Sequence, residues 1–415
     1  NTLLGIIHAC REHPRTFGRL FAGWHGIEGV LREQLLDLDA QDTREIELLR
    51  TTPAAGAIGT CRYRLRETQS ADFARVLEVL DAHDIGFFFY IGGNDSMDTA
   101  QHIHRLAEEC GANVVVIGAP KTIDNDVGDP EFALLDHTPG YGSTARYFAQ
   151  TILNANEENA GSCPADPVLV IQAMGRRTGF IPAAARLADP DRRLPLQIYL
   201  PESAADLAQI SANVGDHLER CGRCIVVVSE GLDVGTLGEV RDAFGHVAYG
   251  ASQLTVAQVV TQHLNTLDLP VPGKARYQVP GTDQRSAAIY ASTVDMAEAY
   301  GVGRACVDLA AERMSGWMGT IRRYPGADYR VYYDKIELAR VANAVRVLPR
   351  AWIAEDAPDV TDEFIAYARP LIGTEWPRIP LVDGCQRFAR FAPKFVARKC
   401  AEYLPQAYRE PGGSA

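Results

Sequence analysis

Apolar runs and glycine turns alternate with amphipathic stretches along most of the chain. Residues 87–91 are apolar throughout, a Gly-Gly turn follows, and residues 96–110 repeat apolar positions at helical spacing. A second apolar run covers residues 113–118. Strand, turn, helix and strand form a parallel pair, and neither run alternates with polar residues. We therefore expect two parallel strands that are covered on both faces.

The same pattern recurs further along the chain. Residues 168–173 and 225–229 predict two more buried strands, and a helix is expected from about 179 to 187. Repeated units of this kind predict an α/β fold with two Rossmann-like, three-layer lobes, each around a largely parallel sheet. The active site should lie in the cleft between the lobes.

The predicted lobes are discontinuous in sequence. We expect the first to combine residues 1–140 with about 287–335, and the second to combine about 141–286 with 336–415, including a C-terminal extension. Within that extension, the acidic stretch 353–376 predicts an added surface segment, and 409–415 a disordered tail.

Composition narrows the class of protein. A length of 415 residues suits two domains, and a net charge of −12 argues against general binding to nucleic acid or to an anionic membrane. No apolar run reaches 18 residues, so we expect no membrane span. Nine scattered cysteines predict reduced thiols and a cytoplasmic location. The pair Cys221 and Cys224 is expected to be a turn before a strand rather than a zinc or redox site.

Four predicted strand ends combine glycine with polar side chains, at 92–96, 120–126, 174–176 and 230–231. Ligands usually bind at the carboxyl ends of parallel strands. Any one of these segments alone would suggest only a solvated turn, whereas four together predict one polar cleft.

The segment 120–126 carries the side chains that phosphoryl transfer needs. Lys121 is a compact cation for a phosphate, and Thr122 can donate a hydrogen bond to a phosphate oxygen. Asp124 can accept a hydroxyl proton, and Asp126 can hold metal-bound water. From spacing alone, a capped turn rich in Asp and Asn is an equal alternative.

Other candidate anion-binding groups are spread along the chain. The turn Gly92-Gly93 lets backbone N–H groups approach an anion, and Ser96 is expected to cap the following helix. It is not a Walker A loop, because no Gly-Lys-Ser/Thr follows. Arginine suits phosphate recognition, although a surface arginine is usually only solvated; the candidates are Arg62, Arg64, Arg176, Arg276 and Arg285.

In their order and spacing these motifs resemble the phosphofructokinases, and most closely the pyrophosphate-dependent branch of that family. The resemblance covers nearly the whole chain, and its most specific parts are Thr-Ile-Asp-Asn-Asp at 122–126 and Met-Gly-Arg at 174–176. It implies reversible, Mg²⁺-assisted phosphoryl transfer from pyrophosphate to fructose 6-phosphate. It also implies a cytoplasmic homodimer or homotetramer, with the donor bound by the first lobe and the sugar phosphate by the second.

The resemblance also assigns roles to residues of this chain. The implied catalytic group is Asp124, Lys121, Asp95 and Arg176, with Asp124 taking the proton of the sugar 1-hydroxyl. The implied sugar-phosphate contacts are Thr122, Ile123, Asp124, Met174, Gly175, Arg176, Glu230, Arg276, Thr282 and Arg285, with Arg276 often acting across a subunit interface. The implied donor contacts are Arg62, Gly92, Gly93, Asp95, Ser96 and Lys121. The implied metal ligands are Asn94 and Asp126.

Two positions bear on the choice of phosphoryl donor. ATP-using members of the family resemble Gly-Gly-Asp-Gly-Ser and Pro-Gly-Thr-Ile-Asp-Asn-Asp, whereas this chain has Asp95 and Lys121 in place of the two variable glycines. An aspartate side chain would occupy the place of a nucleotide α-phosphate, and its charge would repel that phosphate. A lysine adds charge for a pyrophosphate transition state. Both substitutions favour pyrophosphate.

Departures from the family pattern leave alternatives open. Asn94 stands where many members have a metal-associated Asp, and Thr282 where Tyr or His is common. The family's Gly-rich loop falls before Asn1, and we expect further residues upstream. The alternatives are an ATP-dependent phosphofructokinase, a non-catalytic regulatory paralogue that binds sugar phosphate, and a dehydrogenase-like Rossmann protein. The last is disfavoured because no full G-x-G-x-x-G follows the first strands. Activity on other sugar phosphates is also left open.

Overall fold

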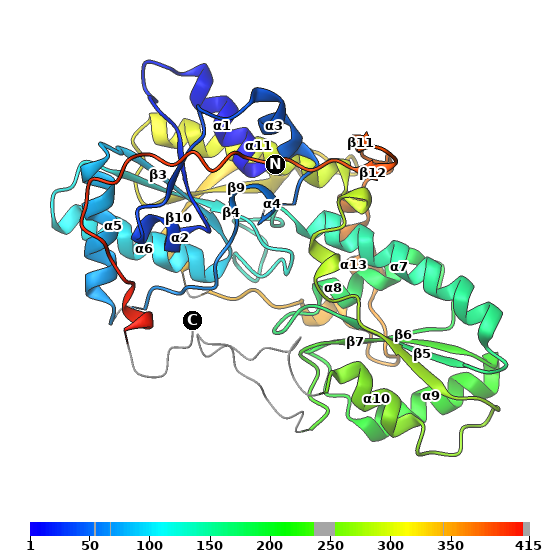
Figure 1. The fold of residues 1–415 in the computed structure, drawn as a ribbon. Helices are drawn as coiled ribbons and strands as arrows, with labels where there is room; N and C mark the ends of the chain where they lie inside the picture. Colours follow the sequence, from blue (N-terminus) through cyan, green and yellow to red (C-terminus); the bar gives the residue numbers. More distant parts are fainter. Residues whose placement is uncertain (54, 67, 236–253, 343, 410–415) are drawn as a thin grey trace.

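The computed structural model describes residues 1–53, 55–66, 68–235, 254–342 and 344–409, which form two lobes with one four-stranded sheet each (Figure 1). Helices cover both faces of each sheet, so each lobe has three layers. The predicted α/β class, with two lobes that each contain a largely parallel sheet, is confirmed.

The first sheet has the order β10-β9-β4-β3. Its strands are β3 (Phe87–Gly92), β4 (Val115–Pro120), β9 (Trp317–Arg323) and β10 (Val331–Glu337). Three of them are parallel, and β10 is an antiparallel edge strand. The helices that pack around the sheet are α1 (Thr2–Glu12), α5 (Ser70–Ala82), α6 (Asn94–Glu109), α11 (Thr293–Ala311) and α12 (Leu338–Val341).

The apolar run in β4 forms a central strand because its side chains alternate between two cores. Val116 packs with Ile103 of α6 on one face. Val115 and Ile117 pack with Ile6 of α1 on the other face. Side chains of a strand point to opposite faces in turn, so a strand buried on both faces needs an unbroken apolar run.

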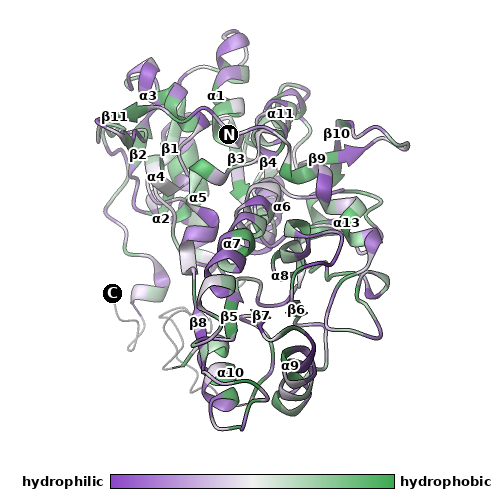
Figure 2. Cartoon of the chain, turned by 90° about the vertical axis from the view of Figure 1, so that its right-hand side faces the viewer, coloured by the Kyte–Doolittle hydropathy of each residue, from purple (hydrophilic) through white to green (hydrophobic). Residues whose placement is uncertain are grey.

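The second sheet has the order β6-β7-β5-β8 and is parallel throughout. Its strands are β5 (Val168–Ala173), β6 (Leu196–Tyr199), β7 (Cys224–Ser229) and β8 (Ala275–Gln278). One face is covered by α7 (Tyr141–Ser162), α8 (Phe180–Ala183) and η2 (Ala184–Ala188). The other is covered by α9 (Leu207–Cys221) and α10 (Val256–Leu264), which carry both hydrophobic and hydrophilic turns (Figure 2).

The remaining elements are short. They are β1 (Phe21–Gly23), α2 (Ile27–Leu31), β2 (Leu35–Asp37), α3 (Thr43–Glu47), α4 (Ala55–Ile58), α13 (Asp362–Ala368), β11 (Leu381–Val382), β12 (Cys385–Gln386) and the 3-10 helices 48–50, 281–285, 288–290, 350–352, 369–372 and 406–408. In the described ranges, no helix is both long and apolar enough to cross a membrane.

Two expectations about the second lobe need correction. The helix expected at 179–187 is a short α-helix that continues as a 3-10 helix. The stretch 353–376 is not an added surface segment, because Ile353, Val360, Phe364 and Leu371 are buried in the core beside α7. Its acidic residues lie mostly between these buried positions and interrupt the apolar pattern in the sequence.

The C-terminal segment packs differently from the predicted grouping of 336–415 with the second lobe. Residues 381–408 run across the first lobe, in red in Figure 1. The amide of Val396 donates to the Leu35 carbonyl at 3.0 Å, and that of Gln406 donates to Asp72 at 3.0 Å. Side-chain and backbone hydrogen bonds therefore tie this segment to the first lobe. Of the tail expected at 409–415, residues 410–415 lie outside the described residues, as does segment 236–253.

Candidate active site

The strand registers bring the four polar strand ends together in pairs. In the first sheet Gly92 lies opposite Pro120, and the Lys121 amide donates to the Gly92 carbonyl at 2.8 Å. In the second sheet Ala173 lies opposite Ser229, so segments 174–176 and 230–231 are neighbours. Gly231 passes so close that a Cβ there would lie 2.0 Å from the Arg176 carbonyl oxygen.

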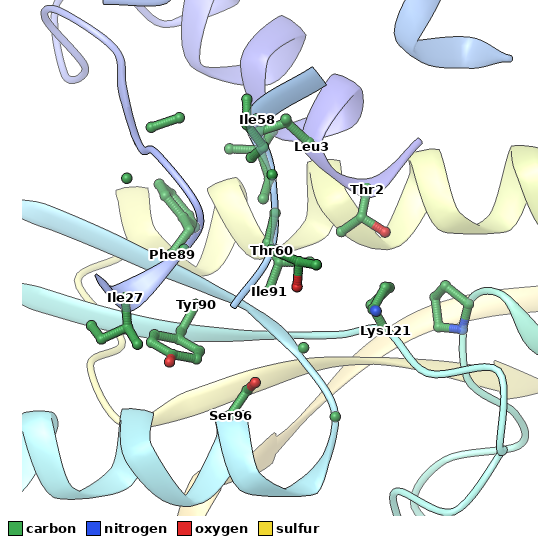
Figure 3. A pocket seen from close by; sticks show the side chains of 18 of the residues that line it. Thr2, Leu3, Ile27, Ile58, Thr60, Phe89, Tyr90, Ile91, Ser96 and Lys121 are labelled. Carbon is green, nitrogen blue, oxygen red and sulfur yellow. The ribbon is translucent and has the colours of Figure 1, made fainter. Parts of the chain in front are cut away.

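One large pocket, of about 2000 Å³, gathers most of the predicted site residues. Those that line it are Arg62, Gly92, Gly93, Asn94, Asp95, Ser96, Lys121, Thr122, Ile123, Asp124, Asp126, Met174, Arg176, Glu230 and Arg285. Figure 3 shows Lys121 and Ser96 on its wall together with Thr60 and Ile91. The pocket continues along β3 as an apolar channel past Phe89 and Leu3.

Three predicted sugar-phosphate contacts do not line this pocket. Gly175 is buried beside Ser229, whose hydroxyl donates to its carbonyl at 2.6 Å. Arg276 lies on the edge strand β8 and pairs with Asp166 at 2.7 Å. Thr282 lies in a 3-10 helix, where its carbonyl accepts from the Ser286 hydroxyl at 3.0 Å. The geometry of one chain therefore does not bring Gly175, Arg276 or Thr282 to the pocket wall, and the roles of all three stay predictions.

Asp124 has the electrostatic environment of a proton acceptor. Burial, followed by the nearby charges of Asp126 and Glu230, raises the pKa of its carboxyl to about 7. The cations of Arg176 and Lys121 act in the opposite direction. A carboxyl whose pKa lies near the working pH can both take and release a proton.

The cations that oppose this shift form part of one charge cluster. The Lys121 side chain is exposed to the pocket, and protein groups on the pocket walls surround it. Burial lowers its pKa, the charge of Arg285 adds to this effect, and Asp124 opposes it. The Arg176 Nε atom lies 3.6 Å from a carboxylate oxygen of Glu230. Burial raises the pKa of Glu230, and Arg176 counteracts the shift. The pocket thus holds cations and carboxylates from both lobes at close range.

The turn after β3 differs in one respect from the expectation. Helix α6 begins at Asn94 with Gly93 as its N-cap, and no side chain caps it. Ser96 therefore lies inside the first turn instead of capping the helix. Asp95 pairs with Arg64 at 3.3 Å on the pocket wall.

Asn94 and Asp126 together offer oxygen ligands for a hard cation. The Asn94 amide nitrogen donates to an Asp126 carboxylate oxygen at 2.9 Å. The Asn94 Oδ1 atom is buried and has no hydrogen-bond partner in the described part of the chain. An unpartnered amide oxygen beside a carboxylate fits a Mg²⁺ ion, which binds few protein ligands and keeps water or phosphate oxygens. No group of three His, Cys, Asp or Glu side chains suited to a metal occurs among the residues described.

Several residues that shape the site were missed by sequence reasoning. Thr178, from the second lobe, donates to the Asp124 carbonyl at 3.0 Å. Asn125 has a left-handed backbone, with φ of 57°, and its Oδ1 accepts from the Thr138 amide and from Arg346. Asn is one of few residues that tolerate this conformation, so a turn at Asn125 was detectable. No local pattern connects it with residue 346.

A second buried cluster lies directly behind the loop. His137 donates or accepts at both ring nitrogens, 2.8 Å from Asp136 and 2.8 Å from Glu298. Burial alone would lower the pKa of His137, but these two carboxylates raise it to about 9. Asp295 accepts from the amides of Gly140 and Ser143 and fixes the turn that precedes α7.

The two-lobed fold and the clustered charges are those of a phosphotransferase. The chain belongs to the phosphofructokinase family, whose profile matches residues 5–310. Within the family, the chain is similar to enzymes named for pyrophosphate. It is 37% identical to the pyrophosphate–fructose 6-phosphate 1-phosphotransferase of Halomonas elongata, over 96% of this chain and 94% of that protein. The enzyme of the same name from Xanthomonas campestris is also 37% identical, with the same coverage.

Solved structures give the same result. The pyrophosphate-dependent phosphofructokinase of Nitrosospira multiformis superposes with a TM-score of 0.86 and 34% identity, over 97% of this chain and 95% of that chain. The described arrangement of two lobes is therefore the arrangement of a known pyrophosphate-dependent enzyme.

Proposed function

We propose that the chain catalyses reversible phosphoryl transfer from pyrophosphate to the 1-hydroxyl of fructose 6-phosphate, giving fructose 1,6-bisphosphate and phosphate. The observation that carries the proposal is the single pocket in which Lys121, Asp124, Arg176 and Glu230 meet from both lobes. Similarity to pyrophosphate-dependent enzymes over nearly the full chain supports the same donor and acceptor.

Asp124 is the proposed proton acceptor. As the sugar O1 atom forms its bond to the transferred phosphorus, the O1 proton passes to the Asp124 carboxylate. The bridging P–O bond of pyrophosphate breaks, and phosphate leaves with the electron pair. A pKa near 7 allows Asp124 to return the proton in the reverse direction. Lys121 and Arg176 then stabilise charge on the transferred group.

The proposed contacts divide between the two substrates. On the sugar side we assign Thr122, Ile123, Met174, Arg176, Glu230 and Arg285, with Gly175, Arg276 and Thr282 as predicted contacts. On the donor side we assign Arg62, Gly92, Gly93, Asp95, Ser96 and Lys121. The pair of Asp95 with Arg64 narrows the place that a nucleotide would need, which favours pyrophosphate.

The proposed cation is Mg²⁺, held by Asn94 and Asp126. When bound it neutralises phosphate charge and orients the donor. We also propose a cytoplasmic homo-oligomer in which Arg276 serves a neighbouring subunit. All nine cysteines are unpaired, as is usual in a reducing compartment. The exposed position of Arg276 on an edge strand suits an inter-subunit contact.

The decisive experiment is a coupled assay with fructose 6-phosphate that compares pyrophosphate, ATP and no donor, each with and without Mg²⁺. We expect turnover with pyrophosphate and Mg²⁺ only. Turnover that depends on ATP instead would refute the proposed donor. No turnover with either donor, together with retained binding of fructose 6-phosphate, would identify a non-catalytic paralogue.

A further inference from the structure

Arg346 lies behind the loop that carries Asp124 and Asp126, outside the pocket and fully buried. It belongs to the segment that leads from α12 toward the second lobe. Its guanidinium donates hydrogen bonds to backbone and amide oxygens. Nε donates to the Asn125 carbonyl at 3.0 Å, Nη2 to Asn125 Oδ1 at 2.8 Å, and Nη1 to the Leu135 carbonyl at 2.7 Å.

The main chain of Arg346 holds the same loop. Its amide donates to the Asp126 carbonyl at 2.8 Å. Arg346 therefore makes three hydrogen bonds to two consecutive loop residues, Asn125 and Asp126, although it is more than 200 positions away in sequence. These hydrogen bonds add to those that the loop makes with Thr138, Thr178 and Tyr367.

Asn125 is the residue with a positive φ within the loop 120–126. A left-handed backbone costs most non-glycine residues about 1–2 kcal/mol and Asn less, and contacts with the surroundings offset what remains of that cost. Asn125 stands between Asp124 and Asp126. A rotation of its backbone would turn the two carboxylates relative to each other and to the pocket.

The burial of Arg346 is itself costly. The guanidinium packs over the Phe132 ring at 4.2 Å, and no ion pair within 4.0 Å joins it to a carboxylate of the described residues. Burial lowers the pKa of Arg346, and the more distant charges of Asp136, Asp129 and Asp126 oppose the shift. Burying a cation that has no directly paired carboxylate is costly, and the hydrogen bonds and the surrounding carboxylates offset only part of that cost. A costly group beside a catalytic loop indicates a positional role, because an apolar side chain would stabilise a core better.

We propose that Arg346 is a positioning residue for phosphoryl transfer, which holds Asn125 in its left-handed conformation and thereby sets the orientation of Asp124 and Asp126. The inference rests on the proposed function of Asp124 as the proton acceptor. Arg346 does not line the pocket, so its loss should act on the rate of the chemical step and not on the binding of the sugar phosphate.

The test compares Arg346→Lys with Arg186→Lys. Lysine keeps the charge in both variants but cannot reproduce the fork of hydrogen bonds. Arg186 is a matched control because it is equally buried and donates to Asp359, to Asp189 and to the Leu196 carbonyl, away from the pocket. Both variants should lose thermal stability to a similar degree.

Only Arg346→Lys should lower kcat, by about 100-fold, with the KM for fructose 6-phosphate changed by less than about 3-fold, because a misplaced reacting group slows chemistry more than binding. Equal kcat losses in the two variants would overturn the proposal. So would a raised KM with unchanged kcat in Arg346→Lys.

A second readout does not need turnover. Amide hydrogen exchange in residues 122–126 should become faster in Arg346→Lys and stay unchanged in Arg186→Lys, since only the first loses support of the loop. Unchanged exchange in Arg346→Lys would overturn the proposal even in an active enzyme. If the wild-type chain shows no turnover with pyrophosphate, the proposed function fails, while faster exchange still identifies Arg346 as the support of the loop.

Discussion

Replacing Asp124 by Asn should change stability and turnover in opposite directions. The variant keeps the shape of the side chain and removes its charge. The fold raises the pKa of this carboxyl from 3.8 to about 7, mainly by burial. A folded-state pKa above the unfolded value means that ionisation is disfavoured in the folded protein. The penalty is absent below pH 3.8, grows as pH rises, and is complete above about pH 7.

The magnitude follows from the size of the shift. Three pKa units at 1.36 kcal/mol each give at most ~4 kcal/mol, and solvent in the pocket reduces this to ~1–2 kcal/mol. The Asn variant should therefore be more stable than the wild type by that amount at pH 8, and equal to it near pH 4. Loss of the proton acceptor should lower kcat by roughly 10²–10⁴-fold with little change in the KM for fructose 6-phosphate.

Stability is best measured by thermal unfolding in EDTA, so that no cation binds beside Asp124. Turnover is measured in the coupled assay with pyrophosphate at saturating Mg²⁺. A rise in melting temperature at pH 8 that disappears at pH 4, together with lost turnover, is the expected result. A variant that keeps turnover within about ten-fold of the wild type would show that Asp124 is not the proton acceptor. A melting temperature lowered at pH 8 would show that its carboxylate is stabilising, contrary to the burial argument.

Three further predictions concern the surroundings of the site. Changing Asp95 and Lys121 together to Gly should cut pyrophosphate-driven turnover by at least ~100-fold, because the Lys121 cation proposed to stabilise the transition state is lost. Activity unchanged with ATP and little changed with pyrophosphate would instead favour the ATP-dependent alternative. His137→Gln should destabilise the fold by up to ~3 kcal/mol below about pH 6.5, because the raised pKa of His137 means that the folded protein stabilises the protonated ring. In urea unfolding, the difference in stability from the wild type should vanish as pH rises through about 9. A difference independent of pH would refute this. Gly231→Ala should raise the KM for fructose 6-phosphate, because its Cβ would lie 2.0 Å from the Arg176 carbonyl oxygen and must push the two strand ends apart; an unchanged KM would show that the loops can yield.

The packing of residues 353–408 could not be predicted from the sequence for a specific reason. The stretch 353–376 contains buried residues such as Phe364 and Leu371, but their spacing follows short 3-10 and α-helical turns without one continuous period. The tail at 381–408 is extended and holds its place by backbone hydrogen bonds to the first lobe, which leave no periodic trace in its side chains.

The sequence by itself determined the βα units, the polar strand ends and the chemistry of the segment 120–126. Each of these depends on local rules: an unbroken apolar run needs burial on both faces, and a glycine turn at a strand end leaves room for an anion. Only the tertiary structure decided which distant groups support that chemistry. Arg346 donates a hydrogen bond to Asn125, and Thr178 donates one to Asp124, because the chain passes from one lobe to the other and back and so places these residues side by side. Such contacts arise from the packing of whole lobes, and no spacing along the chain records them.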